Sequence, residues 1–496
     1  MNSEKLLGVP MRYTMLLAVA CTTSIATASA QSPPPNQVGA WSPVYPWPQV
    51  AVHLHVLPDR RVLTYSDEWV QGQKVTPTTS RTYVVDIPDG EAPLSTWTYV
   101  PNDLTDLFCA GHAFLPDGRL LVIGGQNGSY YKGIANSTIF NNSGGYTWET
   151  PLNGRMSAPR WYPSAITLAS GDILALGGSM QGQDDPNKIP EVWNAATGGW
   201  RTLSGAPRAL PFYPWIFQAP NGKVFLAGHK PETRYLDTNG SGKWSQLYVR
   251  KYAARYEGAA VMYDEGRIMV VGGGSPATNT AETIDLRAAA PAWQFTGSMQ
   301  YGRRYMNATL LADGKVLVTG GGSGANNAAT AVLAAELWDP ATGLWSTMAS
   351  MQKPRLYHGT AVLLPDGRVL SAGGGRPPST NGVNNLNAEI YSPPYLFAGD
   401  RPLLTSAPES IGYGQTFDVG TPDPASITGV TWIGLSSVTH DFNSGQRFSR
   451  LRFAPTETGL TVTAPANGKV APPGHYMLFL LNAQGVPSVS RIVRIG

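Results

Sequence analysis

Apolar strands separated by tight turns recur along most of the chain. Each repeated unit has an apolar strand, an Asp-Gly-like turn and a second apolar strand, and most units end in Gly-Gly. A two-residue turn of this kind fits a type I′ hairpin, in which glycine accepts a positive φ. Seven such units follow one another: His53–Ser66, Gly111–Gly125, Ser164–Gly178, Trp215–Gly228, Gly258–Gly273, Asn307–Gly321 and Gly359–Gly374. The pattern therefore predicts a repeated β-hairpin architecture.

The spacing of the units specifies which repeat architecture this is. Successive units begin about 43 to 58 residues apart, close to the length of kelch-type blades. Outer hairpins also recur, as Glu191-Val192-Trp193, Glu282-Thr283-Ile284 and Glu336-Leu337-Trp338, each followed by a further tryptophan. Seven units predict a seven-bladed kelch-type β-propeller, a ring that leaves only short, protected edges.

The pattern changes after about residue 400. No Gly-Gly unit returns, and the expected strands are Gly429–Ile433, Arg450–Phe453, Leu460–Val462, Tyr476–Asn482 and Ser490–Ile495. Alternation of this kind over roughly a hundred residues fits an immunoglobulin-like β-sandwich. The whole chain is predicted to be all-β, with a signal peptide at 1–30, the propeller at 31–400 and the C-terminal sandwich at 401–496. The Pro-rich lead at 32–48 is expected to form an early strand or to cover an edge.

Composition narrows the function classes. Charged residues make up only 14% of the 496 residues and the net charge is +3, while Gly (55) and Pro (41) are plentiful. Without a basic run or an acidic tail, the sequence indicates no nucleic-acid partner. A monomer is expected.

The N-terminus predicts export. Lys5 and Arg12 flank the apolar run at 15–20, and Ala28-Ser29-Ala30 provides an A-x-A cleavage site. That run is too short to span a bilayer, and no later segment could do so. The expected location is the periplasm or the cell exterior. Lipid attachment at Cys21 is a weaker alternative, because Ala18 stands where a larger aliphatic residue is usual.

Cleavage after Ala30 would leave Cys109 as the single cysteine of the mature chain. One cysteine cannot form an internal disulfide. In an oxidising compartment a lone thiol is expected to be buried, bound to a metal or otherwise bonded. Burial as a small hydrophobic residue is the common outcome.

Residues just before the first strand of each unit are expected to gather around one mouth of the central channel, since that strand lies nearest the axis. The positions are Cys109, Tyr162, Tyr213, Trp215, Tyr256, Arg304, Tyr305, Tyr357 and His358. Taken singly, each is more often a packing residue than a functional one. Adjacent Tyr357 and His358 point to opposite sides of an extended strand, so both can face one site only where the strand begins or twists. Their joint placement nevertheless indicates a functional site.

Several short motifs resemble the galactose oxidase and glyoxal oxidase family of copper radical oxidases. They are Leu107-Phe108-Cys109, Arg160-Trp161-Tyr162-Pro163, Arg355-Leu356-Tyr357-His358 and Ser436-Ser437-Val438-Thr439-His440, followed by the stretches 473–479 and 485–490. The resemblance runs from the first blade to the C-terminus. The Arg160–Pro163 motif is most similar to the glyoxal oxidase branch.

The resemblance implies a specific centre. One copper ion would be bound by Tyr162, Tyr357, His358 and His440, with an open position for solvent or substrate. A thioether would join the Cys109 sulfur to the Tyr162 ring, which would hold a radical, and Tyr357 would take the proton of the substrate. His440 would come from a loop of the C-terminal domain that reaches into the channel.

The residue types agree with this chemistry. Two imidazoles and two phenolates suit Cu(II), and a metal cation promotes loss of the phenol proton. Copper supplies one electron change and the tyrosyl radical the second, so an aldehyde or primary alcohol could be oxidised while O2 is reduced to H2O2.

Substrate residues are less well defined by the sequence. Galactose oxidase places a tryptophan after the Gly-Gly-Ser of the third blade, but Met180 follows Ser179 here. Trp161 or Trp215 could supply that ring instead. Arg255 and Arg304 are candidates for contacting substrate hydroxyls. These departures favour small aldehydes or simple primary alcohols over galactose.

Other histidines and other functions remain open. His112 is expected to support the ligands rather than bind metal, and His53 and His55 could face the channel. A non-catalytic kelch-type binding module would leave Cys109 as a thiol and bind no copper. A glycan hydrolase or lyase would need paired carboxylates at the mouth, and the sequence shows no such pair.

Overall fold

The computed structural model describes residue 8 and residues 33–496, except 68, 71–72, 75–79, 91–93, 95, 325–326 and 376–383. The chain divides into residues 1–33 and a compact unit, Pro34–Gly496. The predicted signal peptide and the alternative lipid site at Cys21 lie outside the described residues, apart from Gly8. None of the helices in the described part of the chain is long and apolar enough to cross a membrane.

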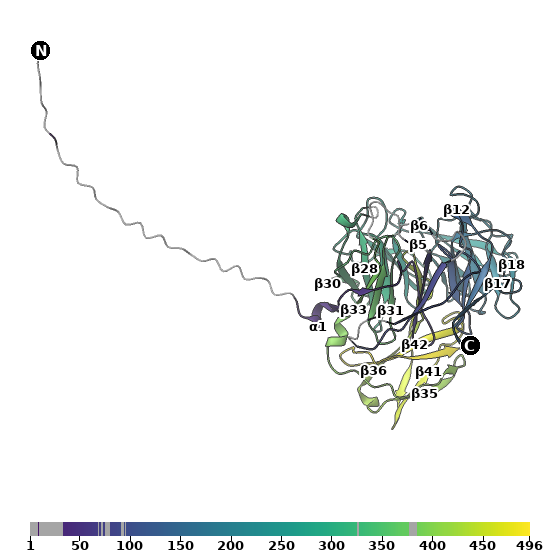
Figure 1. Ribbon diagram of the computed structural model, residues 1–496. Coiled ribbons are helices and arrows are strands. Elements are labelled where there is room, and N and C mark those ends of the chain that lie inside the picture. Colours follow the sequence, from purple (N-terminus) through teal and green to yellow (C-terminus); the bar gives the residue numbers. More distant parts are fainter. Residues whose placement is uncertain are drawn as a thin grey trace, which may run out of the picture. The chain divides into compact units, whose positions relative to one another are not determined.

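Seven antiparallel sheets each contain one of the repeated units. Figure 1 shows these sheets together, with the strands that follow residue 400 grouped below them in yellow and yellow-green. Blade one has β3 (His53–Val56), β4 (Val62–Asp67), β7 (Ser80–Val85) and β8 (Trp97–Tyr99). Blade two has β9 (Gly111–Phe114), β10 (Leu120–Ile123), β13 (Ser137–Asn141) and β14 (Thr147–Glu149). Blade three has β15 (Trp161–Thr167), β16 (Ile173–Ser179), β17 (Glu191–Asn194) and β18 (Gly199–Thr202). Blade four has β19 (Ile216–Gln218), β20 (Val224–Leu226), β21 (Glu232–Asp237) and β22 (Lys243–Val249).

The remaining blades follow the same order along the chain. Blade five has β23 (Ala259–Asp264), β24 (Arg267–Val271), β25 (Ala281–Asp285) and β26 (Gln294–Phe295). Blade six has β27 (Arg304–Leu310), β28 (Val316–Gly322), β29 (Ala334–Asp339) and β30 (Leu344–Ser350). Blade seven has β31 (Gly359–Leu363), β32 (Val369–Gly373) and β33 (Asn387–Ser392). Two short ribbons, β5 (Trp69–Val70) with β6 (Gln73–Lys74) and β11 (Gln126–Asn127) with β12 (Ser129–Gly133), lie outside the blades.

The Pro-rich lead completes blade seven. Its strands β1 (Ala40–Trp41) and β2 (Tyr45–Pro46) both pair with β33, although they precede it by about 350 residues. The edge of the last blade is therefore covered by the start of the compact unit, which limits exposed strand edges. First strands of neighbouring blades, such as β27 and β31 or β31 and β3, pack side by side around the hub. Short helices are α1 (Pro35–Val38), η1 (Ala328–Thr330), η2 (Pro394–Phe397) and η3 (Pro424–Ser426).

The C-terminal domain is a second, smaller β structure. One sheet contains β34 (Ser410–Ile411), β36 (Ile427–Gly434), β39 (Phe448–Arg450), β42 (Gly474–Asn482) and β43 (Arg491–Ile495). The other contains β35 (Thr416–Gly420), β40 (Phe453–Pro455) and β41 (Gly459–Thr463). The strand expected at Arg450–Phe453 is wrong, because the chain there leaves the first sheet after β39 and joins the second at β40. The all-β prediction, with a propeller and a C-terminal sandwich, is confirmed.

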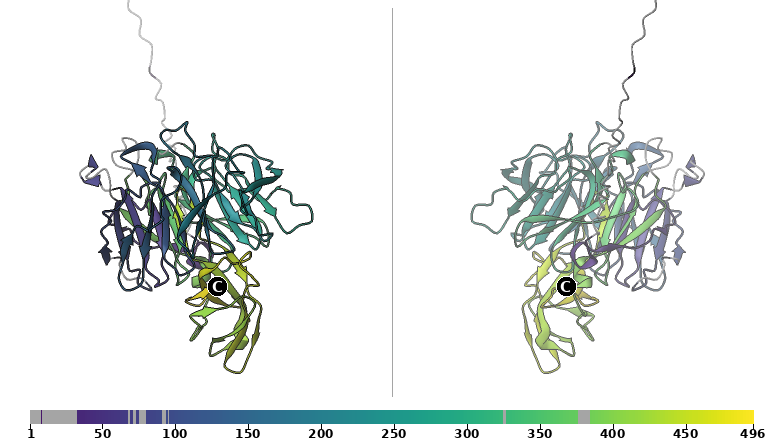
Figure 2. Two further views of the ribbon diagram at one scale, coloured as in Figure 1. Left: turned by 90° about the vertical axis from the view of Figure 1, so that its right-hand side faces the viewer. Right: turned by 90° about the vertical axis from the view of Figure 1, so that its left-hand side faces the viewer.

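A hairpin of the C-terminal domain enters the propeller hub. Its strands β37 (Ser437–Thr439) and β38 (Phe442–Asn443) extend the sheet of blade one, because β37 pairs with β3. Both views in Figure 2 show yellow strand within the ring of blades, above the C-terminal domain. Gln446 fixes the base of the hairpin, since its side chain donates to the Ala308 carbonyl at 2.8 Å and accepts from the Leu310 N–H at 2.9 Å.

Candidate copper centre

The residues just before or at the start of the inner strands share an unusual backbone conformation. In blades two to seven one residue at this point has a left-handed φ between +46° and +67°, and we call these the mouth residues: Cys109, Tyr162, Tyr213, Glu257, Tyr305 and His358. A left-handed residue breaks the alternation of an extended strand. The Tyr357 and His358 rings consequently stack, with centroids 3.8 Å apart and planes at 28°.

Backbone hydrogen bonds connect several mouth residues across blades. The N–H of Tyr162 donates to the Cys109 carbonyl at 2.9 Å, and that of Tyr213 donates to the Tyr162 carbonyl at 3.0 Å. The N–H of Tyr305 donates to the Glu257 carbonyl at 2.8 Å. Adjacent blades are therefore tied together at the level of the site, which fixes the positions of side chains that come from different blades.

His440 lies at the turn of the inserted hairpin, also with a left-handed φ of 45°. Its ring centroid is 4.6 Å from that of His358, 5.6 Å from Tyr357 and 4.5 Å from Tyr162. Its Nε2 is 3.0 Å from the Tyr162 hydroxyl and 3.9 Å from the Cys109 Sγ. The two hydroxyls of Tyr162 and Tyr357 are in direct contact. The structure thus brings together all five residues expected to form the centre.

Hydrogen bonds set the tautomer of both histidines. His440 Nδ1 lies 2.7 Å from the Thr439 hydroxyl, which itself donates to the Val52 carbonyl at 2.8 Å, so Nδ1 carries the proton. His358 Nδ1 lies 3.0 Å from the Gly375 carbonyl, which can only accept, so this Nδ1 is also protonated. Nε2 of both rings is then the unprotonated nitrogen, as in metal-binding histidines whose Nδ1 donates to a neighbouring group.

The donor set fits copper. One nitrogen or sulfur atom from each of Cys109, His358 and His440 lies within 4.8 Å of the others, and both phenol oxygens join them. Two imidazoles with two phenolates match the preference of Cu(II) for nitrogen and oxygen donors. Burial is the main cause that raises the pKa of Tyr162 well above its ordinary value, with the nearby Cys109 and Tyr357 next. A bound cation would reverse this effect and favour the phenolate.

Aromatic side chains cover Tyr162. The Trp161 ring lies 3.7 Å from the Tyr162 ring with planes at 9°, so the stacking ring comes from the residue directly before Tyr162. Tyr131 and Phe212 meet Trp161 edge-on at 4.9 Å and 5.3 Å. Trp215, the other candidate for this role, is buried in the blades and stacks on His229 at 4.2 Å.

The two candidate arginines have different surroundings. Arg255 has no exposed side-chain surface and pairs with the equally buried Glu282 at 3.0 Å, so a contact with substrate does not fit its placement. Arg304 lies at the mouth, where it pairs with Glu257 and covers the Tyr305 ring at 5.1 Å. Arg304 therefore remains available as a substrate-binding residue.

Arg255 belongs to a set that the sequence analysis missed. Four blades contain a buried Arg–Glu ion pair: Arg160–Glu191, Arg255–Glu282, Arg303–Glu336 and Arg355–Glu389. Each arginine precedes an inner strand and each glutamate begins or lies within a third strand. The recurrence of both residue types at fixed places in the repeat was the signal for these pairs.

Three buried histidines lie behind the centre. His53 Nε2 accepts the backbone N–H of Cys109 at 3.2 Å, a contact that the sequence did not indicate. His55 and His112 both bind the Ser437 hydroxyl through Nδ1, at 2.9 Å and 2.7 Å. Burial lowers the pKa of all three and takes that of His112 to about 3. These rings are therefore neutral at physiological pH and support the hairpin that carries His440.

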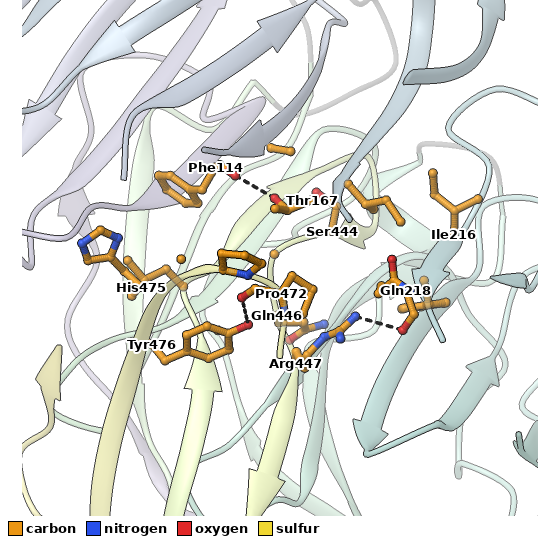
Figure 3. Close-up of a pocket in the computed structure, with 18 residues that line it drawn as sticks. Phe114, Thr167, Ile216, Gln218, Ser444, Gln446, Arg447, Pro472, His475 and Tyr476 are labelled. Atoms are coloured by element: carbon orange, nitrogen blue, oxygen red, sulfur yellow. Dashed lines mark hydrogen bonds between the residues drawn. The ribbon is translucent and has the colours of Figure 1, made fainter. Parts of the chain in front are cut away.

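A separate cavity of about 60 Å³ lies between the blades and the C-terminal domain (Figure 3). Within it Arg447 donates to the Gln218 carbonyl at 3.2 Å, and the Tyr476 hydroxyl donates to the Pro472 carbonyl at 2.7 Å. Its lining contains none of the five residues of the centre. The Arg447 bond links blade four to the C-terminal domain from which the hairpin projects, whereas the Tyr476 bond lies within that domain.

Comparison with known proteins adds independent evidence. Family models match two regions: "Glyoxal oxidase N-terminus" at residues 272–395 and "Galactose oxidase-like, Early set domain" at 401–495. An aldehyde oxidase of Vitis pseudoreticulata is 30% identical over 450 residues, which cover 79% of this chain and 82% of the relative. A galactose oxidase of Gibberella zeae is 28% identical, covering 98% of this chain and 76% of the relative. A solved structure of a fungal alcohol oxidase of the AA5 family, in complex with copper, matches with a TM-score of 0.83 and 28% identity, covering 92% of this chain and 99% of the other.

Proposed function

Because the chain belongs to the galactose oxidase and glyoxal oxidase family of copper radical oxidases, we propose that it is exported and oxidises small aldehydes or primary alcohols. Two electrons would pass from each substrate molecule to O2, which leaves as H2O2. The observation that carries this proposal is the convergence of two phenol oxygens and two imidazoles at the hub. Neither the binding module nor the glycan hydrolase is favoured by this family.

Each residue of the centre has a proposed role. Tyr162, Tyr357, His358 and His440 would hold copper, which would act as a one-electron acceptor and lower the pKa of bound groups. Cys109 and Tyr162 would be joined by a thioether, and the modified ring would supply the second oxidising equivalent. The Tyr357 oxygen would accept the hydroxyl proton of the alcohol or of the aldehyde hydrate. Stacking of Trp161 on Tyr162 would keep water from the radical.

Residues at the mouth and in the Arg160–Pro163 motif bear on the choice of substrate. Arg304 and its partner Glu257 provide polar atoms next to Tyr305, and Tyr305 lies 5.7 Å from the Tyr357 ring. Trp161 in its motif supports a glyoxal-oxidase-like preference, while Met180 replaces the tryptophan that galactose oxidase uses. We therefore expect aldehydes to be better substrates than galactose.

Mass spectrometry and peroxide release test the proposal together. After copper loading in the presence of O2, the intact protein should lose two hydrogen atoms, and a cross-linked peptide pair should contain Cys109 and Tyr162. Peroxide should be released with a glyoxal-type dialdehyde, a simple aldehyde and a primary alcohol, and least with galactose. Faster turnover of galactose than of every aldehyde would refute the substrate class.

The Tyr162→Phe variant tests the radical assignment. Removal of the hydroxyl takes away a proposed copper ligand and the oxidisable phenol, so peroxide release should fall to background. The side chain is buried at a left-handed position that Phe can share, so the thermal unfolding temperature should change little. Undiminished peroxide release would contradict the role of Tyr162.

A further inference from the structure

Blade one departs from the pattern that links the mouth residues. In blades three, four and six, the N–H of the mouth residue donates to a carbonyl of the preceding blade's mouth residue. Cys109 in blade two follows blade one, where none of the described residues at the start of β3 has a left-handed φ. The Cys109 N–H is donated instead to a side chain, the Nε2 of His53, at 3.2 Å.

His53 is held firmly in this position. The ring is completely buried, stacks on Tyr65 at 4.3 Å with planes at 14°, and meets His112 edge-on at 5.4 Å. Because Nε2 accepts a hydrogen bond, the proton must be on Nδ1. Nδ1 has no hydrogen-bond partner among the residues that the structure describes.

An imidazole is a costly residue at this point. A buried polar group without a partner costs free energy that an apolar side chain would avoid. The His53 ring has no exposed surface and packs against the Tyr65 ring, so an apolar ring would also fit this position. Within the part of the chain that the structure describes, the His53 imidazole makes its one hydrogen bond to the Cys109 N–H, which indicates that this contact is its function.

We infer that His53 is a positioning residue for formation of the thioether, an inference that rests on the proposed function. A left-handed conformation is strained for a residue with a side chain, and Cys109 has a φ of 61°. The Cys109 N–H is fixed by the hydrogen bond that it donates to His53, and the Cys109 carbonyl is fixed by the hydrogen bond that it accepts from the Tyr162 N–H. The sulfur then stays beside the Tyr162 side chain, with which the thiol interacts, and 3.9 Å from His440 Nε2.

Formation of the thioether is a two-electron oxidation, and O2 is the electron acceptor. The S–H bond of Cys109 and one ring C–H bond of Tyr162 break, and a C–S bond forms. The two electrons and two protons released reduce one O2 to H2O2. His53 exchanges no electrons or protons in this step; it limits the conformations that Cys109 can adopt before the bond forms.

Four variants separate positioning from packing. His53→Phe keeps an aromatic ring against Tyr65 but removes the acceptor. His53→Gln keeps an acceptor at the same distance from the backbone, whereas the shorter His53→Asn does not reach it. His55→Phe is the matched control, since His55 lies two residues further along the strand, is equally buried and also contacts Tyr65 and His112, but binds Ser437 instead of Cys109.

The measurement is the rate at which copper-loaded protein loses two hydrogen atoms, followed by intact mass in air-saturated buffer, with copper content and thermal unfolding recorded for each variant. His53→Phe and His53→Asn should form the thioether about tenfold more slowly than the unmodified chain, the effect of losing one hydrogen bond. His53→Gln should stay within about threefold of the unmodified rate. His55→Phe loses a contact with Ser437 of the hairpin but leaves the acceptor of the Cys109 N–H in place, so it should slow thioether formation less than His53→Phe does. Copper content should be the same in the three His53 variants and the unmodified chain.

Three results would overturn the inference. A His53→Phe variant that forms the thioether at the unmodified rate leaves no role for the hydrogen bond. Equal slowing by His53→Phe and His55→Phe shows a packing effect only. If His53→Phe does not fold, the comparison of His53→Gln with His53→Asn tests the inference instead. Equal rates of thioether formation in these two variants would refute a positioning role. Failure of the unmodified chain to form any thioether would overturn the proposed function as well, so the two failures are distinguishable.

Discussion

Thr439 is the residue whose removal tests most directly how the hairpin presents His440 to a metal. It is buried, and its hydroxyl donates to the Val52 carbonyl at 2.8 Å and accepts from His440 Nδ1 at 2.7 Å. The substitution Thr439→Val keeps the shape of the side chain but removes both bonds. The His440 ring then loses the contact that fixes its tautomer and its orientation.

The expected magnitude follows from these two bonds. Loss of the partner of a metal-binding histidine typically weakens metal binding by about 10- to 100-fold, which corresponds to about 1.4 to 2.7 kcal/mol. The Val52 carbonyl and the His440 N–H are left without this partner in a buried place, so the copper-free protein should lose about 2 kcal/mol of stability. No cavity contributes, because valine and threonine have nearly the same volume.

Two controls make the result specific to His440. Thr439→Ser retains the hydroxyl and should bind Cu(II) within about threefold of the unmodified chain. Thr431→Val removes another buried hydroxyl of the same domain, which donates to the Ala312 carbonyl at 2.8 Å, and should cost stability without changing copper affinity. Affinity is measured by competition with a chelator, and stability by urea unfolding of copper-free protein. Unchanged copper affinity in Thr439→Val would refute the argument.

Two further outcomes concern stability. Arg160→Met should destabilise the protein by about 3–5 kcal/mol, because it leaves the fully buried Glu191 carboxylate unpaired. Measured by urea unfolding, the double variant with Glu191→Leu should regain part of this stability. A double variant that regains none would contradict a pairwise effect. Burial lowers the pKa of His112 to about 3 and that of His229 to about 4, so the folded state binds fewer protons than the unfolded state. The contribution of the two histidines to the free energy of unfolding is complete above about pH 6.5. It is lost as the pH falls toward 4, at about 1.4 kcal/mol per pH unit for each group. Equal midpoints of urea unfolding at pH 7 and pH 5 would contradict this.

The fold was accessible from the sequence because every unit repeats the same local signals. The turn glycines and the apolar strands of Gly359–Gly374, for example, give β31 and β32, which pair with Gly359 opposite Gly373. Strands of the C-terminal domain were less well defined, since they lack a repeat that would average out local ambiguity. A strand was expected across residues 450–453, where the chain changes sheets.

The sequence indicated which residues would gather at the candidate site, but not how their side chains are arranged there. Simple alternation predicts that Tyr357 and His358 diverge, and only a left-handed φ of 67° at His358 brings the rings together. Position in the repeat placed Arg255 near the mouth, but it could not show that the side chain is directed toward Glu282, 27 residues away in sequence. Long-range pairing of this kind is set by tertiary packing and leaves little local signal.

The Arg–Glu pairs explain how the propeller tolerates so many left-handed residues around one site. A left-handed residue costs roughly 1–2 kcal/mol, and blades two to seven each have one at the mouth. Arg160 and Arg355 each donate from Nη1 to a carbonyl of the Gly-Gly turn in their own blade, Gly177 at 2.8 Å and Gly373 at 2.9 Å. Their partners Glu191 and Glu389 hold the same guanidinium groups from the third strand.

Each pair therefore connects three strands of one blade: the start of the first strand, the end of the second strand, and the third strand. This connection lies within two or three residues of a proposed copper ligand. The cost of a strained backbone at Tyr162 and His358 is offset by polar groups that are already satisfied before a metal arrives. It follows that the proposed ligands Tyr162, Tyr357 and His358 are held in place by the blades themselves, whereas the proposed ligand His440, on its inserted hairpin, also depends on the C-terminal domain for its position.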